Sequence, residues 1–219
     1  MRAGATGFVV AVDGPAASGK GTIAAGLGAH FKLPVLDTGL LYRAVGMLVL
    51  RQGGDFEDAP AAARIAAGLD PASLEDPALR GVEAGQAASR VAPHPAVREA
   101  LRVFQTSFAR QAGGAVIDGR DIGTAIVPGA PAKLYVTAAA PVRARRRWLQ
   151  LKERGENVAY ETVLADIESR DARDAGREAS PMRPASDAVL LDTTEMTISA
   201  AADAARRIVE AARARWERS

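Results

Sequence analysis

Residues 8–22 read FVVAVDGPAASGKGT, an apolar run that ends in a glycine-rich turn carrying a single lysine. Residues 8–12 have the length and β-branched content of a buried parallel strand. Residues 14–20 then fit the G-x-x-x-x-G-K frame, whose glycines let successive backbone N–H groups face one anion. The helix that follows adds its positive N-terminal end. This stretch therefore predicts a strand, a phosphate-binding loop and a helix.

The loop also indicates which ligand it holds. Lys20 is placed to reach the β- and γ-phosphates of a nucleoside triphosphate. The next residue, usually Ser or Thr, is Gly21, with Thr22 one place later, and this form resembles nucleoside-monophosphate kinases more than GTPases or motor ATPases. We therefore assign Thr22 to a phosphate or to magnesium-bound water. The expected ATP-binding residues are those of the loop: Gly14, Pro15, Ala16, Ala17, Ser18, Gly19, Lys20, Gly21 and Thr22.

Composition limits the class of protein. The chain has 219 residues, enough for a single domain over 1–219 with small insertions. Its 28 Lys and Arg against 26 Asp and Glu leave a net charge of +2, too balanced to indicate nucleic acid as a partner. The absence of cysteine excludes disulfides, thiolate metal sites and cysteine nucleophiles. No signal peptide or spanning apolar stretch is seen, so we expect a soluble, cytoplasmic protein without a membrane partner. We also expect it to be a monomer.

Strand-like and helix-like stretches alternate along the chain. This alternation predicts an α/β fold, a P-loop NTPase three-layer arrangement with a five-stranded parallel sheet and helices on both faces. The expected strands are 8–13, 34–37, 115–118, 132–137 and 188–192. The expected helices are 22–31, 39–51, 99–111, 141–154, 160–170 and 198–216.

Two segments depart from this alternation. Residues 52–95 are rich in Gly, Ala, Pro and Asp and have weak periodicity, so we expect an inserted helical subdomain there. Residues 154–184 are charged, with Gly155 and Gly176 as possible hinges, and are expected to form a mobile lid.

Charged residues follow the third expected strand, where parallel sheets bind ligands. Asp118 is placed to hold magnesium-bound water, as is Asp13 at the end of the first strand. Arg120 is placed to clamp a phosphate. The alternative is a tight turn capped by Asp118.

Two further segments carry candidate phosphate ligands. Thr38 is a good N-cap for the second helix, and Arg43, one turn later, would face a second phosphate unless it is an ordinary surface residue. In the segment 170–177, if helical, one face carries Arg170, Arg173, Asp174 and Arg177. Such a row places cations over a migrating phosphoryl group, although alternating charges also suit an exposed, salt-bridged helix.

Taken in order, these segments resemble the bacterial cytidylate kinase family, a group of P-loop nucleoside-monophosphate kinases. The resemblance covers essentially the whole chain and rests on GPAASGKGT, LDTGLLYRA, AASRVAPHPAVREAL, IDGRDIGT and ESRDARDAGREASP. It implies transfer of a phosphoryl group from ATP, with Mg²⁺, to CMP and dCMP. It also implies a monophosphate-binding insertion, 52–95 here, and a short lid, 154–184.

The resemblance also implies roles for individual residues. Arg43, Arg120 and Arg177 would hold the acceptor phosphate and, with Lys20, form the catalytic set. Ser89, Arg98 and Asp121 would recognise cytosine, and Arg170 and Asp174 the sugar hydroxyls. An aspartate accepts from the exocyclic amine of cytosine but meets a carbonyl in uracil. The CMP-binding residues so implied are Thr38, Arg43, Ser89, Arg98, Arg120, Asp121, Arg170, Asp174 and Arg177. By sequence alone, Ser89 and Arg98 are ordinary helix-surface residues.

One departure and two alternatives accompany the resemblance. The span from Arg43 to Ser89 is shorter than in members that build a small antiparallel sheet there, so we expect a reduced, more helical insertion. The nearest alternative function is another small-molecule kinase, for adenylate, guanylate or shikimate. A nucleotide-dependent switch is the other, but no N-K-x-D guanine-reading motif is present.

Overall fold

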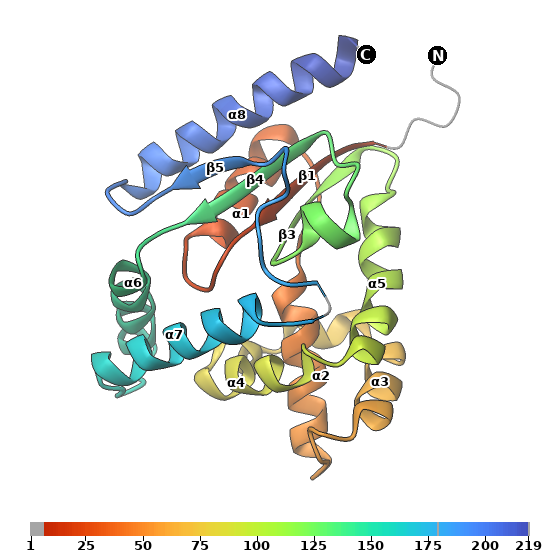
Figure 1. The fold of residues 1–219 in the computed structure, drawn as a ribbon, viewed down its shortest axis with the longest axis vertical. Helices are drawn as coiled ribbons and strands as arrows, with labels where there is room; N and C mark the ends of the chain where they lie inside the picture. The colour runs from red at the N-terminus through yellow and green to blue at the C-terminus, as the bar shows by residue number, and fades with distance from the viewer. Residues whose placement is uncertain (1–6, 179, 219) are drawn as a thin grey trace. The chain divides into compact units, whose positions relative to one another are not determined.

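The structure, a computed structural model, describes residues 7–178 and 180–218. The chain divides into two compact units, one of Met1–Leu36 with Phe108–Ser219 and the other of Asp37–Ser107. We refer to them as the sheet unit and the helical unit (Figure 1). Residue 179, inside the expected lid 154–184, lies outside the described residues.

A parallel sheet of five strands, in the order β2-β3-β1-β4-β5, confirms the expected α/β fold. The strands are β1 Phe8–Asp13, β2 Val35–Asp37, β3 Gly114–Gly119, β4 Ala132–Thr137 and β5 Val189–Asp192. All of β1 is buried, because this central strand has a neighbour on each side and apolar side chains on both faces. In the register of β1 with β3, Val12 lies opposite Asp118 and Asp13 opposite Gly119. The carboxyl ends of the two strands therefore meet at one edge, where such sheets bind ligands.

Some helices of the sheet unit pack against the sheet, and others lie beyond the carboxyl ends of its strands. They are α1 Lys20–Phe31, α6 Ala140–Glu153, α7 Tyr160–Ala175 and α8 Ile198–Arg218, with a π-helical turn, η3, at Ile122–Ile126. α1 packs against α8, and α8 lies along β4 and β5 (Figure 1). Buried apolar residues of these elements, Val10, Leu27 and Val209 among them, make the core. α6 and α7 pack together beyond the carboxyl ends of the strands (Figure 1).

The helical unit is built around α2. Its elements are α2 Thr38–Arg51, α3 Ala59–Ala67, η1 Pro71–Glu75, η2 Pro77–Arg80 and α4 Val82–Val91, and α5 Pro95–Ala109 begins in it and ends in the sheet unit. Its core includes Met47 and Leu79. α4 approaches α2 so closely that a Cβ on Gly46 would lie 2.6 Å from the carbonyl carbon of Ala87. The elements within 52–95 are all helical, as the composition of that segment predicts.

Two local predictions are wrong. Asp37, not Thr38, is the N-cap of α2: its carboxylate accepts from the Gly39 N–H at 2.9 Å, and Thr38 is the first helical residue. An aspartate one residue earlier fills the capping role equally well. α7 ends at Ala175, so Arg177 does not continue the helical face of the segment 170–177 but follows the C-cap, Gly176.

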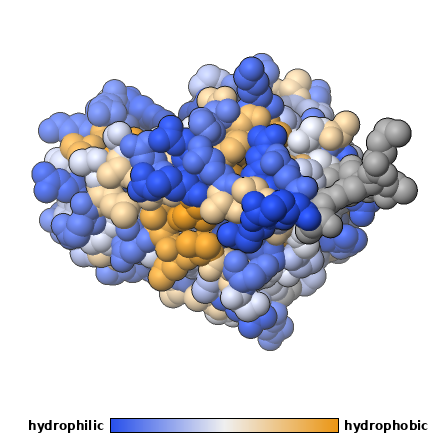
Figure 2. Space-filling model, turned by 90° about the horizontal axis from the view of Figure 1, so that it is seen from above, coloured by the Kyte–Doolittle hydropathy of each residue, from blue (hydrophilic) through white to orange (hydrophobic). Residues whose placement is uncertain are grey.

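The surface seen in Figure 2 is mainly hydrophilic, with a smaller apolar area. Among large apolar side chains, Ile198 and Leu190, at the start of α8 and on the edge strand β5, are 77% and 62% exposed. Within the described ranges, no helix combines the length and apolar character that crossing a membrane requires.

Candidate active site

The loop between β1 and α1 depends on its glycines. Gly14 has φ 145°, and a Cβ there would lie 2.0 Å from the carbonyl oxygen of Val136 in β4. Gly19, the N-cap of α1, has φ 92°, and Ala17 also lies in the left-handed region at φ 58°. A positive φ is easy for glycine but strained for Ala17, and such strain persists where the surrounding structure enforces it, often at functional sites. The loop leads directly into the N-terminus of α1, a ready anion site.

Lys20 and Asp118, predicted from separate motifs, are brought together. The Lys20 Nζ lies 3.9 Å from the Asp118 Oδ1, and their side chains are 11% and 4% exposed. A Cβ on Gly21 would lie 3.4 Å from the other Asp118 oxygen, so this position faces the carboxylate. Thr22 is exposed and lines a cavity on another part of the loop.

The carboxylate of Asp13 is hydrogen-bonded to backbone N–H groups. Its two oxygens accept from the N–H groups of Ile122 and Gly123 in η3, at 2.8 and 2.7 Å. Burial raises its pKa from 3.8 to about 6, a shift that these two hydrogen bonds reduce. Asp13 therefore anchors the turn after β3, the turn that carries Arg120 and Asp121. Neither sequence spacing nor residue type indicated this anchor.

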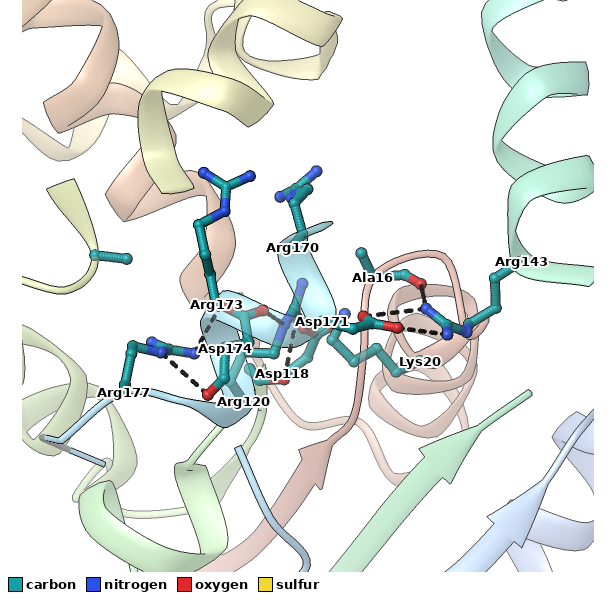
Figure 3. Close-up of polar contacts among 12 residues, drawn as sticks. Ala16, Lys20, Asp118, Arg120, Arg143, Arg170, Asp171, Arg173, Asp174 and Arg177 are labelled. Atoms are coloured by element: carbon teal, nitrogen blue, oxygen red, sulfur yellow. Dashed lines mark hydrogen bonds and ion pairs between the residues drawn. The ribbon is translucent and has the colours of Figure 1, made fainter. Parts of the chain in front are cut away.

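Arg120 and Arg177 share one carboxylate, that of Asp174 (Figure 3). Arg120 Nε donates to Asp174 Oδ2 at 3.0 Å, and Arg177 Nη2 donates to Asp174 Oδ1 at 2.9 Å. The side chain of Arg120 is 20% exposed, that of Arg177 7% and that of Asp174 15%. Burial alone would raise the pKa of Asp174, but the two guanidinium groups outweigh it and hold the pKa below 3.8. The structure thus joins the turn after β3 to α7 through a charged cluster.

Arg170 and Arg173 extend from α7 on the same side in Figure 3. Arg170 lies 3.8 Å from Asp166, one turn earlier, and burial, followed by the charge of Arg120, lowers the pKa of its guanidinium. Arg173 is exposed, and its Nε donates to the Ser169 carbonyl at 3.3 Å. Arg170 is the more desolvated of the two, and a desolvated guanidinium interacts more strongly with an anionic or polar ligand.

A cavity of about 480 Å³ opens beside the loop in the sheet unit. Its lining comes from the loop, α1, α6 and the start of α8: Ala17, Ser18, Gly19, Thr22, Ile23, Arg146, Leu149, Gln150, Glu153, Thr193, Met196, Thr197, Ile198 and Ala201. Arg146 donates to the hydroxyl and carbonyl of Thr193, at 3.0 and 2.7 Å. The Thr193 hydroxyl lies 3.1 Å from the carbonyl oxygen of Ser18, so β5 is tied to the loop. Sequence reasoning missed Arg146 and Thr193. The basic run 143–154 and the position just after a strand end were the available signals.

The remaining expected residues lie in the helical unit. Arg43 Nη1 donates to the carbonyl oxygens of Leu79 and Gly81, at 2.7 and 3.4 Å. Ser89 and Arg98 are each 8% exposed, so their interpretation as helix-surface residues is wrong. The Arg98 guanidinium lies 5.7 Å from the ring centre of Tyr42, within the range of a cation–π contact. Arg98 Nη1 also donates to the Ala92 carbonyl oxygen at 3.4 Å, as expected for a buried polar side chain, which is ordinarily hydrogen-bonded.

Comparison with known proteins identifies the family. The family model described as Cytidylate kinase matches residues 10–212 of this chain. The chain belongs to the cytidylate kinase family. Its match covers the loop, the turn after β3, α7 and the elements of the helical unit.

Members of this family from several bacteria are similar over almost the whole chain. The protein named Cytidylate kinase from Caulobacter vibrioides is 62% identical, covering 95% of this chain and 98% of the relative. The one from Xanthobacter autotrophicus is 59% identical over 94% and 99%, and the one from Rhodopseudomonas palustris 50% over 94% and 98%. An uncharacterized protein from Eubacterium ventriosum has a similar fold, with a TM-score of 0.55 at 14% identity over 93% of this chain and 98% of its own.

Among residues 7–178 and 180–218, no group of three or more His, Cys, Asp or Glu side chains is arranged to hold a metal ion. Of the expected magnesium-shell residues, Asp118 lies beside Lys20, whereas Asp13 directs both oxygens to backbone N–H groups. The donor chemistry at Asp118 fits water bound to a hard cation, and that at Asp13 fits a structural anchor.

Proposed function

We propose that this protein transfers the γ-phosphoryl group of ATP to CMP and dCMP, giving ADP with CDP or dCDP. Membership of the cytidylate kinase family supports the reaction class. The observation that carries the proposal is the cluster of Arg120, Asp174 and Arg177 at the strand edge that also holds the phosphate loop. Phosphoryl transfer depends mainly on positioning and charge stabilisation, and a partly buried pair of guanidinium groups can supply both.

The donor would be held by the loop and by the cavity beside it. The loop N–H groups and Lys20 bind the phosphates, and the cavity of about 480 Å³ accepts the adenine base. Its lining combines apolar side chains, such as Ile23 and Leu149, with polar ones, among them Arg146, Gln150 and Thr193. A planar purine suits such a lining, since it is desolvated on its faces and hydrogen-bonded at its edge.

The acceptor phosphate would be held by Arg43, Arg120 and Arg177. An oxygen of this phosphate attacks the γ-phosphorus, and the bond from that phosphorus to the bridging oxygen of ADP breaks. No covalent enzyme intermediate is needed. Asp174 remains ionised at neutral pH, because its pKa is held low, and keeps the two arginines of its cluster oriented toward the acceptor.

Base and sugar recognition would use the buried polar residues. Ser89, Arg98 and Asp121 recognise cytosine, and Arg170 and Asp174 contact the sugar hydroxyls. The burial of Ser89, Arg98 and Asp121, which are 5–8% exposed, supports this role, since an incorrect base would leave them unpaired. Thr38, also buried, belongs with the CMP-binding residues in this proposal.

Mg²⁺ would accompany the ATP phosphates. When bound, it neutralises charge on the transferring phosphoryl group. Asp118 would hold its water ligands, and Thr22 would contact a phosphate or such a water.

The proposal also covers the lid, the insertion, the cellular location and the oligomeric state. Residues 154–184, with α7 in their middle, form a lid that excludes water, and residues 52–95 form the monophosphate-binding insertion. The enzyme acts on small molecules as a cytoplasmic monomer, without nucleic acid or membrane.

A panel of acceptors tests the function. Purified protein is given Mg²⁺-ATP with CMP, dCMP, UMP, AMP or GMP, and ADP release is measured for each. We expect rapid release with CMP and dCMP only. Release that is fast without any acceptor, or fastest with AMP or GMP, would contradict the proposal in favour of a nucleotide switch or another kinase.

A further inference from the structure

Arg143, a residue of α6, contacts three separate parts of the sheet unit. Its Nε donates to the Ala138 carbonyl at 2.7 Å, just before α6. Its Nη1 donates to the Ala16 carbonyl at 3.2 Å, in the phosphate loop. The same Nη1 and the Nη2 bind the two carboxylate oxygens of Asp171 in α7, at 3.2 and 2.6 Å (Figure 3). The guanidinium is thus used on all three of its nitrogens.

Burial makes this arrangement costly to break. The Arg143 side chain is 6% exposed and that of Asp171 25%. Removing one member of such a pair leaves the other charge desolvated without its partner, a larger loss than for a surface ion pair. A bidentate Arg–carboxylate contact also fixes the relative orientation of the two groups, which a single-point contact does not.

The contact between Arg143 and the phosphate loop lies next to a strained residue of the loop. Ala16 precedes Ala17, whose φ is 58°, and a loop whose N–H groups converge on an anion directs its carbonyl groups outward. Those carbonyl groups need donors. Arg143 supplies one at Ala16, and thereby helps to hold the conformation that presents the N–H groups.

The contact with α7 is made by Asp171, which is close along the helix to the residues of the charged cluster. Asp171 lies next to Arg170 and one turn before Asp174, on a helix where residues three apart are neighbours. Holding the Asp171 carboxylate therefore restrains the position of Asp174, which orients Arg120 and Arg177.

We infer that Arg143 and Asp171 are a positioning pair that couples the conformation of the phosphate loop to the placement of α7 and its charged cluster. The inference rests on the proposed function and deepens it. Neither side chain needs to touch a substrate. With the pair intact, the donor loop and the acceptor-binding arginines are held in register; without it, ATP still binds but the transferring groups are misaligned. A small misplacement of reacting groups is enough to lower the rate by large factors.

Asp171→Asn is the sharpest test, since it keeps the shape but removes the charge and one acceptor oxygen. We expect kcat with CMP to fall roughly 10- to 100-fold, while the Kd for ATP changes less than about threefold and the protein stays folded at assay temperature. Asp171→Glu should recover activity to within about fivefold of wild type, because a carboxylate can again bind both guanidinium nitrogens.

Asp203→Asn is the matched control. It makes the same substitution in an ion pair with Arg206, 3.2 Å apart on α8, with both side chains about half exposed. We expect kcat to stay unchanged there. A double-mutant cycle with Arg143→Gln completes the experiment: if the two residues act as one unit, the double variant loses no more activity than the worse single variant.

If the pair of Arg143 and Asp171 only stabilised the fold, the kinetic results would differ. A lowered Tm with unchanged kcat in Asp171→Asn, or additive losses in the cycle, would overturn the inference. Should Asp171→Asn fail to fold, Arg143→Lys is measured instead, because a lysine cannot bind both carboxylate oxygens of Asp171 in the bidentate way. Unchanged kcat in that variant would overturn the inference. If the wild-type enzyme uses a different acceptor from CMP, the proposed function fails, and the pair is judged by kcat with that acceptor.

Discussion

Neighbouring aspartates at the edge of the sheet differ in role because their surroundings differ. Asp13 directs both oxygens to N–H groups of η3 and thereby shapes the turn. Asp174 binds two guanidinium groups and stays ionised. Asp121 is 5% exposed at the start of η3 and is the residue to which we assign the exocyclic amine of cytosine. Identical side chains thus serve as anchor and as counter-ion, and our proposal gives the third the role of reading the base.

Asp121→Asn tests the base reader. An amide can donate where the carboxylate could only accept, so it tolerates the uracil carbonyl and binds the cytosine amine less well. We expect kcat/KM for CMP to fall on the order of 100-fold, about 2.7 kcal/mol of transition-state stabilisation, with a rise in UMP use relative to CMP. Steady-state kinetics with both acceptors at saturating ATP measures this. An unchanged CMP-to-UMP ratio contradicts the assignment, and Asp203→Asn serves again as the control.

At the scale of elements, the approach of α4 to α2 decides where Ser89 lies. Gly46 on α2 has no side chain, and the backbone of Ala87 occupies the space that one would need. Ser89 is two residues further along α4 and is buried. Glycine is needed at position 46 because the two helices pack so closely there, and not because the backbone adopts an unusual angle.

Gly46→Ala is therefore expected to destabilise the protein by about 1–3 kcal/mol, because the new methyl group forces the two helices apart. Gly26→Ala is the matched control: it lies on the exposed part of α1, where no atom lies within 4 Å of the added Cβ. That substitution should stabilise the protein by up to about 1 kcal/mol, through helix propensity. Urea unfolding followed by circular dichroism measures both. Equal effects of the two substitutions would argue against the packing explanation.

The elements themselves were largely predictable, and their ends were less so. The five strands were found within one or two residues, since each is a short apolar run between breaking residues. The start of α1 at Lys20 and the end of α7 at Ala175 differ from the expected 22 and 170. Helix ends depend on caps and on packing of the last turn, which hydrophobic periodicity does not report.

At the scale of the whole molecule, the net charge is only +2, yet two carboxylates, Asp174 and Asp13, change the stability of the fold with pH in opposite directions. Asp174 has a folded-state pKa below 3.8, so its contribution to stability is present above that pH and is lost as pH falls through the folded pKa. Asp13 has a folded-state pKa of about 6, so its ionised form is disfavoured in the folded protein. Its cost is present above pH 6 and disappears as pH falls toward 3.8.

Two variants separate these contributions. The advantage of wild type over Asp174→Asn should be full at pH 5–7 and shrink below about pH 4. The stability of wild type relative to Asp13→Asn should instead rise as pH falls from 7 to 4, by on the order of 3 kcal/mol, since the pKa changes from 3.8 to about 6 on folding. Urea unfolding at pH 7, 6, 5, 4 and 3 measures both differences. Parallel pH profiles for the two variants would contradict the assigned environments.

The sequence by itself determined the individual strands, the phosphate loop and the order of the motifs, because each of these is encoded in residues that are close together in the chain. An apolar run forms a buried strand, and glycines 14 and 19 permit the loop wherever that strand lies. Only the tertiary structure decided which charges meet. The burial of Ser89 and Arg98, the attachment of Asp13 to η3 and the contact of Arg143 with both Ala16 and Asp171 join residues far apart in the chain. The spacing of residues along the sequence does not predict such contacts. Their free energy comes from desolvation and charge pairing, which exist only once the chain has folded.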